Sequence, residues 1–292
     1  PAPVAPEFRG IDHWLNGPPQ TLAALRGKVV LIDFWTYSCI NCLRTLPHVE
    51  HWAAAYRDAG LVVVGVHTPE FAFERVVANV RDNARRLGVR HPVAVDNDYG
   101  TWTAWGNQYW PATYLVDRSG RVRRAHFGEG DYAETEASIR TLLAERGARL
   151  PARTALADPT PIGSLTPETY LGAARLARYA GSTLVPGIEG TYVPPQQLRR
   201  DELAYGGRWR VEAEHIVAGK GATIRLDYTA RDVFAVLAGR GTVTVRVDGR
   251  PSGTVRVSGA RLYTVVRRER RARHVLELGL TPGLRAYSFT FG

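Results

Sequence analysis

Two hydrophobic patterns divide the chain at about residue 150. Before that point, short apolar runs typical of buried strands alternate with stretches in which apolar residues recur every three or four positions, as on one face of a helix. After it, short runs of alternating apolar and polar residues follow one another with turn residues between them. The patterns therefore predict an α/β domain followed by a mostly β domain.

The first half is predicted to contain five strands and three helices. Gly60 and Gly88 follow the first two helices at the position that glycine favours after a helix, and residues 117–120 join the last two strands into a hairpin. Strands that alternate with helices and end in a hairpin indicate a mixed sheet. The predicted strands are residues 28–34, 61–67, 92–95, 112–116 and 122–127, and the predicted helices are residues 40–59, 71–87 and 132–146.

The second half opens with a different kind of sequence. Residues 147–165 hold three prolines and no periodic pattern, which is typical of an interdomain linker. After this linker only residues 167–179 have a helical pattern, and the rest has the turn spacing of a β-sandwich. The predicted domains are residues 1–146 and 166–292, and the strands of the second are residues 209–213, 222–228, 233–238, 241–247, 253–257, 261–266, 274–278 and 286–291.

The composition suits two globular domains. The chain has 292 residues, of which 45% are hydrophobic. Its longest apolar runs, residues 29–32 and 61–66, are far shorter than the roughly 20 residues that a membrane-spanning helix needs. The chain starts at Pro1 and contains no methionine, so any signal peptide or membrane anchor would lie upstream. The lack of an anchor is therefore no evidence for a cytoplasmic protein.

The net charge of +10 is unevenly distributed. The first 146 residues hold 16 basic and 16 acidic residues, and the remaining ones hold 22 and 12. Of the 38 basic residues, 36 are arginine, a bias that fits codon usage better than selection for phosphate contacts. We therefore expect no nucleic-acid partner.

The only two cysteines, Cys39 and Cys42, form a Cys-x-x-Cys motif at the start of the first predicted helix. A bond between them would close too short a loop to add much stability. At a helix start, unpaired N–H groups and the helix dipole stabilise a thiolate on Cys39, with Cys42 one turn behind it. Cys39 can then attack a substrate disulfide, and Cys42 can resolve the mixed disulfide. No cofactor is expected beyond the redox-active disulfide.

Half of a zinc knuckle has the same spacing of cysteines. A zinc site would need two further ligands, and His48 and His51 are the nearest candidates. On the predicted helix they point away from the motif, so ordinary, partly exposed histidines are the favoured interpretation and no metal is expected.

Further motifs resemble the thioredoxin superfamily, in particular the extracytoplasmic TlpA/ResA-like thiol-disulfide proteins. They are Leu-Arg-Gly-Lys at residues 25–28, Asp-Phe-Trp at 33–35 ahead of the cysteines, Pro47 five residues after the second cysteine, and the stretch 110–117 that begins Trp-Pro. The resemblance implies an α/β thioredoxin-like fold for the first domain.

The whole chain resembles the exported C-terminal part of DipZ-type proteins. In these, a CcdA/DsbD-like membrane electron carrier precedes a thioredoxin-like domain and a β-sandwich similar to carbohydrate-binding modules. The resemblance implies a jelly-roll-like sandwich for residues 166–292 and an extracytoplasmic location, on the cell-envelope side, with a membrane anchor in the full-length protein. It also implies a CcdA/DsbD-like electron donor and exported, disulfide-bearing proteins as partners.

The family pattern makes Pro111 a cis-proline that faces the active disulfide. This would leave the backbone of Trp110 free to pair with a substrate strand beside Cys39, whereas the alternative is a trans proline that opens a strand. The indole of Trp110 is favoured for surface recognition, and Trp102 and Trp105 are favoured as packing residues.

Two carboxylates also match the family pattern. Asp33 corresponds to a buried carboxylate behind Cys42, where desolvation would raise its pKa and let it take the proton from that thiol. The alternative is an aspartate at a strand end that faces solvent. Glu70 lies near the position of an active-site glutamate in ResA-like proteins, although the loop is one residue out of step.

The sequence departs from the family around the cysteines. Ser38 stands where tryptophan is usual, and Ile40 and Asn41 separate the cysteines, so no histidine or lysine deepens the stabilisation of the thiolate. A reductase fed from a membrane partner is therefore favoured over a strong oxidant. A disulfide-forming oxidase or isomerase remains the alternative, as does an envelope- or glycan-binding module with a regulatory redox site.

The second domain offers two candidate recognition features. Its strand aromatics are expected to be core residues. The arginine-rich run at residues 267–273 is expected to be a solvated loop, with an anionic lipid surface or a cell-wall polymer as the alternative partner. The aromatics are Tyr205, Trp209, Tyr228, Tyr263 and Tyr287.

Overall fold

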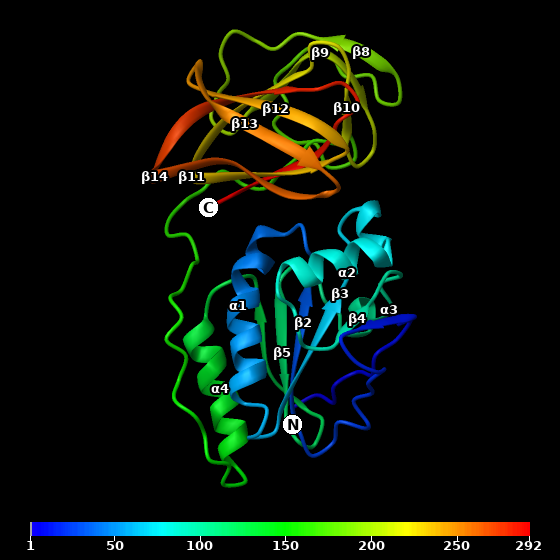
Figure 1. The fold of residues 1–292 in the computed structure, drawn as a ribbon, viewed down its shortest axis with the longest axis vertical. Coiled ribbons are helices and arrows are strands. Elements are labelled where there is room, and N and C mark those ends of the chain that lie inside the picture. Colours follow the sequence, from blue (N-terminus) through cyan, green and yellow to red (C-terminus); the bar gives the residue numbers. More distant parts are fainter. Residues whose placement is uncertain (1) are drawn as a thin grey trace. The chain divides into compact units, whose positions relative to one another are not determined.

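The structure is a computed structural model that describes residues 2–292. The chain divides into two compact units, one ending at Thr160 and the other beginning at Pro161. Each unit has its own β-sheet and its own hydrophobic core (Figure 1). Within the described residues, no helix combines the length and the apolar character needed to cross a membrane.

The first unit is built on a mixed sheet, as predicted. Its six strands have the order β1-β4-β3-β2-β5-β6. β2, β3 and β4 are parallel to one another, whereas β1, β5 and β6 pair in the antiparallel sense. All seven residues of β2 are buried because this strand has a neighbour on each side and helices above it. The strands are β1 (His13–Leu15), β2 (Val29–Trp35), β3 (Leu61–His67), β4 (Val93–Val95), β5 (Ala112–Val116) and β6 (Val122–Phe127).

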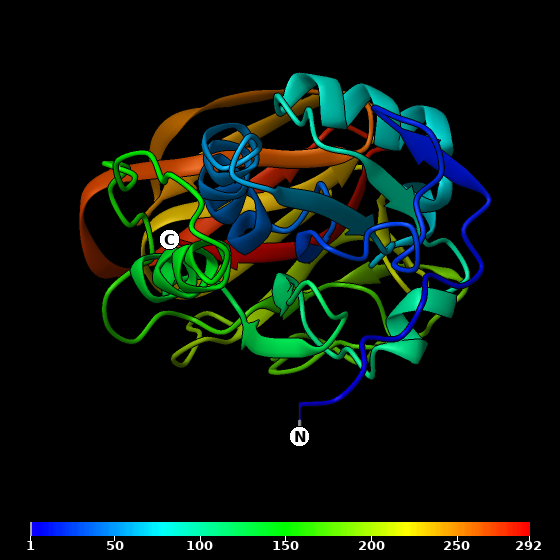
Figure 2. The ribbon, with the colours of Figure 1, turned by 90° about the horizontal axis from the view of Figure 1, so that it is seen from below.

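Helices cover the sheet on both faces. α1 (Ile40–Ala55), α2 (Val77–Arg86) and α4 (Tyr132–Ala144) pack on one face, and the short α3 (Gly100–Ala104) with the N-terminal segment packs on the other. α1 and α4 lie side by side in both views (Figures 1 and 2). Because side chains alternate along a strand, Asp33 faces α1 together with its neighbours Leu31 and Trp35.

The predicted helices end earlier than expected. The first stops at Ala55, because residues 56–60 turn back into β3, with Gly60 at a φ of 101°. The second is divided into a 3-10 helix η1 (Ala72–Arg75) and α2, which are separated by the extended residue Val76. β1 and α3 are too short for periodicity to reveal them, and both were missed.

The predicted linker, residues 147–165, contains no helix or strand, but its first part packs on the first unit. The backbone N–H of Thr154 donates to Glu136 on α4 at 2.9 Å. Nε2 of His48 on α1 lies 3.2 Å from the carbonyl oxygen of Ala157. These contacts explain why the first unit extends to Thr160. The domain limits 1–146 and 166–292 remain predictions about independently folding parts.

The second unit consists of one antiparallel sheet of nine strands. β11 pairs with β14, β15 and β9, and β9 is also joined to β15 through β10, so the sheet folds back over its own core. All five aromatics predicted as core residues are buried. The strands are β7 (Thr169–Tyr170), β8 (Glu189–Tyr192), β9 (Leu203–Val211), β10 (Ile216–Ala218), β11 (Thr223–Ala238), β12 (Arg240–Val247), β13 (Arg250–Ser258), β14 (Arg261–Leu280) and β15 (Arg285–Phe291).

Four strands predicted in the second half merge into two. The predicted pair 222–228 and 233–238 forms the single strand β11, and the pair 261–266 and 274–278 forms β14. The arginine-rich run lies inside β14, so the expectation of a loop was wrong, whereas its expected exposure to solvent is confirmed. Residues 268–271 form a bulge opposite β11 and are exposed, which is why their charges interrupt the hydrophobic pattern.

The helix predicted at residues 167–179 is absent. Its backbone groups bond to other strands, since the N–H of Leu171 donates to Tyr287 and that of Ala173 donates to Glu212. A Cβ on Gly172 would lie 2.2 Å from the backbone carbon of Glu214. Tertiary pairing and close backbone approach therefore override an apolar spacing that resembled a helix face.

Candidate active site

The two cysteines occupy different environments at the start of α1. Cys39 is the N-cap residue and is half-buried, whereas Cys42 is 1% exposed. The backbone N–H of Cys42 donates to Sγ of Cys39 at 3.3 Å. The open first turn of the helix favours a negative charge on the sulfur of Cys39, which is also the sulfur that a substrate can reach.

The buried thiol needs a base before it can react. Burial raises the pKa of Cys42 well above its ordinary value, and the neighbouring Cys39 and the charge of Asp33 raise it further. Only the thiolate attacks a disulfide, so a group beside Cys42 has to take its proton.

Asp33 provides such a group. It lies in the middle of β2 and is 1% exposed. Burial raises the pKa of its carboxyl to about 7, although the positive charge that His91 can carry opposes the shift. The alternative of a solvent-facing aspartate at a strand end does not hold, because Asp33 is enclosed beneath α1. Its role as the proton acceptor of Cys42 remains a prediction.

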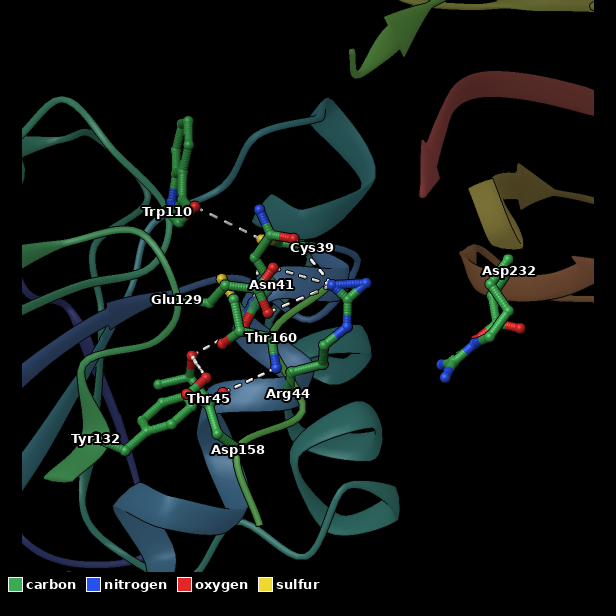
Figure 3. A network of polar contacts seen from close by, with 12 residues as sticks. Cys39, Asn41, Arg44, Thr45, Trp110, Glu129, Tyr132, Asp158, Thr160 and Asp232 are labelled. Carbon is green, nitrogen blue, oxygen red and sulfur yellow. Dashed lines mark hydrogen bonds and ion pairs between the residues drawn. The ribbon is translucent and has the colours of Figure 1, made fainter. Parts of the chain in front are cut away.

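The Trp110–Pro111 peptide bond is cis. This places the carbonyl oxygen of Trp110 3.8 Å from the sulfur of Cys39, which donates its S–H to it (Figure 3). The indole Nε1 of Trp110 donates to the carbonyl of Thr68 at 3.0 Å, and its ring lies on that of Trp102 with centroids 4.2 Å apart. Trp110 is thus held half-buried beside the reactive sulfur. The recognition roles of Trp110 and Pro111 remain predictions.

The most exposed aromatic rings near this loop were not among the predicted site residues. Tyr109 and Phe127 are 52% and 51% exposed, with ring centroids 5.4 Å apart. Trp105, in contrast, is 8% exposed and packs on Phe34 and Tyr114. Because many aromatics in this stretch are core residues, the sequence offered no way to separate the exposed pair from the buried ones.

Glu74, four residues after the predicted Glu70, contacts the residue next to the reactive cysteine. Its Oε1 accepts a hydrogen bond from the hydroxyl of Ser38 at 2.5 Å, and its Oε2 accepts the N–H groups of Glu70 and Phe71. Glu74 is fully buried, and burial raises the pKa of its carboxyl to about 7 in spite of these donors. No feature of the sequence ranks Glu74 above Glu70, whose predicted role is untested.

A polar network joins the second turn of α1 to the start of α4 and to the loop before it (Figure 3). Arg44 pairs with Glu129 at 3.0 Å, and both side chains are 12% exposed. The hydroxyl of Thr45 lies 3.2 Å from that of Tyr132. Both contacts hold the part of α1 that directly follows the cysteines against the residues that begin α4 and precede it.

His48 does not face the cysteines. Its ring stacks on Tyr132 with centroids 3.8 Å apart, which accounts for its burial. In residues 2–292, no group of three or more histidine, cysteine, aspartate or glutamate side chains is placed to hold a metal ion.

Comparison with known proteins gives consistent matches to both units. The redoxin family matches residues 2–143, and the family described as thioredoxin-like C-terminal domain matches residues 166–292. The thiol-disulfide oxidoreductase YkuV of Bacillus subtilis is 31% identical over 140 residues, which cover 48% of this chain and 94% of YkuV. A solved thioredoxin-like protein in its oxidised form is 32% identical and covers 49% of this chain and 97% of its own, with a TM-score of 0.46.

Relatives of greater length also match. Protein DipZ of Mycobacterium bovis and that of Mycobacterium tuberculosis are 46% identical over 298 residues, which cover 99% of this chain but 43% of DipZ. The chain thus spans less than half the length of these relatives. The first unit has the thioredoxin-like fold, as expected, and the second has an all-β sheet.

The buried carboxylate of Asp33 makes stability depend on pH. Its pKa of about 7 in the folded protein lies above the ordinary value of 3.8, so the folded state holds the proton more tightly. Between these pH values the free energy of unfolding therefore falls as pH rises. We predict that Asp33→Asn raises that free energy at pH 8 by up to about 4 kcal/mol, with no gain near pH 4. Chemical denaturation at both pH values measures the effect.

Asp117→Asn is the matched control. Partial burial acts to raise the pKa of Asp117, but hydrogen bonds from Ser119 and Arg121 hold it below its ordinary value. Its charge is therefore stabilising, and its removal should lower the free energy of unfolding at pH 8. Equal losses in both variants would show that Asp33 does not carry a desolvated charge.

Proposed function

Since this chain belongs to the thioredoxin-like thiol-disulfide oxidoreductases, we propose that it reduces disulfide bonds of exported proteins through Cys39 and Cys42. The observation that carries the proposal is the contrast between an accessible sulfur at a helix start and a buried thiol close to the carboxylate of Asp33. This contrast gives the two sulfurs different tasks.

The reaction proceeds in two exchanges. The thiolate of Cys39 attacks one sulfur of a substrate disulfide, so a mixed disulfide forms and the other substrate sulfur leaves with the electron pair and takes a proton. Cys42 then gives its proton to Asp33 and attacks the sulfur of Cys39. The Cys39–Cys42 bond forms, the bond to the substrate breaks, and the second substrate thiolate leaves. The substrate gains two electrons, and the protein is oxidised.

The reducing direction is supported by what surrounds Cys39. The start of α1 stabilises a thiolate on Cys39. The residues between the cysteines add no positive charge to this effect, since they are Ile40 and Asn41. Less stabilisation of the thiolate means less stabilisation of the reduced form and a more negative potential. An oxidase or isomerase would use the same residues in the opposite direction.

The resemblance to DipZ supports the remaining parts of the proposal. We propose an extracytoplasmic location, with an anchor in the full-length protein, and a CcdA/DsbD-like membrane protein that returns electrons to the Cys39–Cys42 disulfide. The cis bond before Pro111 and the half-buried Trp110 form the edge along which a substrate strand lies beside Cys39. Glu70 is proposed to act at the same site through its neighbour Glu74, whose carboxylate contacts Ser38.

The second unit is proposed to hold the redox unit at the envelope. The exposed bulge at residues 268–271 contains three arginines, which suit an anionic lipid or cell-wall surface. We propose a jelly-roll-like sandwich for residues 166–292. Glycan binding by this unit is the alternative role, and binding through aromatic rings would respond little to salt.

The different tasks of the two sulfurs predict different reactivities. In the reduced protein, a limiting amount of alkylating reagent should label Cys39 first, because Cys42 is buried and its pKa is raised. Cys42→Ser should accumulate mixed disulfides with substrates, and Cys39→Ser should not. Peptide mass spectrometry measures both results. Preferential labelling of Cys42 would overturn the assignment.

The surroundings of Cys39 predict the reduction potential. We expect a value closer to that of thioredoxin, about −270 mV, than to that of DsbA, about −120 mV. A titration against glutathione followed by thiol trapping measures it. Asn41→His would place a cation between the cysteines and should shift the potential to a less negative value. A wild-type value above about −180 mV would support the oxidase instead.

A further inference from the structure

The carboxylate of Asp33 has a histidine beside it on the buried face of the sheet. Asp33 is the register partner of Gly65 on β3, and both positions face α1. A Cβ on Gly65 would lie 2.7 Å from Nε2 of His91 and 2.9 Å from Nε1 of Trp35. The ring of His91 therefore fills the space next to Asp33 that a side chain at position 65 would otherwise take.

The other side of the histidine ring meets a second carboxylate. Nδ1 of His91 lies 2.6 Å from Oε1 of Glu50 on α1. Burial acts to raise the pKa of Glu50, but the close contact with His91 and a hydrogen bond from the backbone N–H of Arg90 hold it below its ordinary value. His91 is 5% exposed, whereas the side chain of Glu50 is 21% exposed. The imidazole thus lies between a buried acid and one that reaches solvent.

The outer end of this arrangement is accessible. Glu50 and His91 line a pocket of about 630 Å³ together with His51, Arg57 and Arg90. Both arginines are exposed. The pocket lies behind α1, away from the Trp110 edge of the site, because its lining comes from the middle and end of α1 and from the segment before β4. A proton that reaches Glu50 can therefore pass to water.

The inner end of this arrangement, next to Asp33, holds buried polar atoms without hydrogen-bond partners. In residues 2–292, three buried side chains here carry polar atoms with no hydrogen-bond partner: Oδ1 of Asp33, Nε1 of Trp35 and both ring nitrogens of His91, Nδ1 in spite of its 2.6 Å contact with Glu50. Each such atom costs about 1–3 kcal/mol, so the cluster does not exist to stabilise the fold. Buried polar atoms of this kind call for a functional explanation, and two of these three can exchange a proton.

We propose that His91 and Glu50 carry the proton that Asp33 takes from Cys42 out to the pocket behind α1. The inference rests on the proposed thiol-disulfide exchange. It concerns how the base is reset, whereas the exchange itself needs only the cysteines and Asp33. His91 and Glu50 are positioning residues, since neither touches the substrate or a sulfur atom.

The relay balances protons at each step. Cys42 loses its proton to the carboxylate of Asp33, and the resulting acid, once a side-chain rotation brings it to the ring, gives a proton to Nε2 of His91. The proton on Nδ1 then passes to Glu50 and from there to water. No electrons move in these steps, and each group ends in the charge state in which it began.

The groups that face the relay are few. Cys42 and Glu50 approach from α1, Asp33 from β2, and His67 from β3. Burial lowers the pKa of His67 to about 3, so it stays neutral and does not compete for the proton. Beyond Glu50 the charged groups that line the pocket are Arg57 and Arg90, with His51 beside them.

The test follows the two exchanges separately in one turnover. Reduced protein is mixed with a chromogenic aromatic disulfide, whose first thiol is released by Cys39 and whose second is released when Cys42 resolves the mixed disulfide. Wild-type protein, His91→Ala, Glu50→Gln and the control His51→Ala are compared between pH 5 and pH 9. His51 lines the same pocket but is not part of the relay.

The relay predicts an effect on the second release only. At pH 7 the rate of release of the second thiol should fall by about tenfold or more in His91→Ala and in Glu50→Gln. The rate in His51→Ala should match that of the wild type. His91→Ala opens space next to the pocket. Added imidazole should therefore restore the release of the second thiol in this variant, in proportion to the concentration of imidazole free base. A purely structural role of His91 would show no such dependence on the base.

The outcomes separate the two proposals. If wild-type protein releases no second thiol, the function proposed for Cys39 and Cys42 fails. If it releases both and the second release is unchanged in His91→Ala and Glu50→Gln, Asp33 exchanges its proton by another route and the relay is wrong. Glu50→Gln keeps the shape of the side chain, so it decides the question even if His91→Ala does not fold.

Discussion

The site depends on one constraint, a carboxylate enclosed in the middle of an apolar strand. Asp33 cannot be charged in its buried place without loss of stability, and burial raises its pKa to about 7. That loss is tolerated because an acid with such a pKa can both take and return a proton near neutral pH. The arrangement around it follows: α1 lies over the strand and brings Cys42 close, and Gly65 leaves room for His91.

The same enclosure separates the two ends of the site. On the Trp110 side, Cys39 is accessible and contacts the carbonyl before the cis bond. On the pocket side, Glu50 reaches solvent from beneath α1. Electrons and protons can therefore leave the buried thiol in different directions, electrons through the sulfur of Cys39 and protons through the base. The ion pair between Arg44 and Glu129 keeps the helix that joins both ends in place.

The sequence predicted those parts whose signal is local. The strands 61–67, 112–116 and 122–127 were predicted with the bounds observed, because the first two are apolar runs and the third follows directly on the turn residues 117–120. The cysteine motif likewise marks its own helix start. His91, Glu50 and Glu74 could not be predicted, since their importance comes from residues 36 to 58 positions away that only the fold brings beside them. In the second unit, charged residues interrupt β14 and hide its length.

The titration of Asp33 tests the central claim most directly. The carboxyl signal of this residue, assigned by its loss in Asp33→Asn, can be followed by carbon NMR in the reduced protein from pH 3 to pH 10. The account predicts a midpoint near 7, because the carboxyl is enclosed beneath α1. A midpoint close to the ordinary value of 3.8 would show that water solvates this carboxylate. In that case Asp33 could not serve as the base for Cys42.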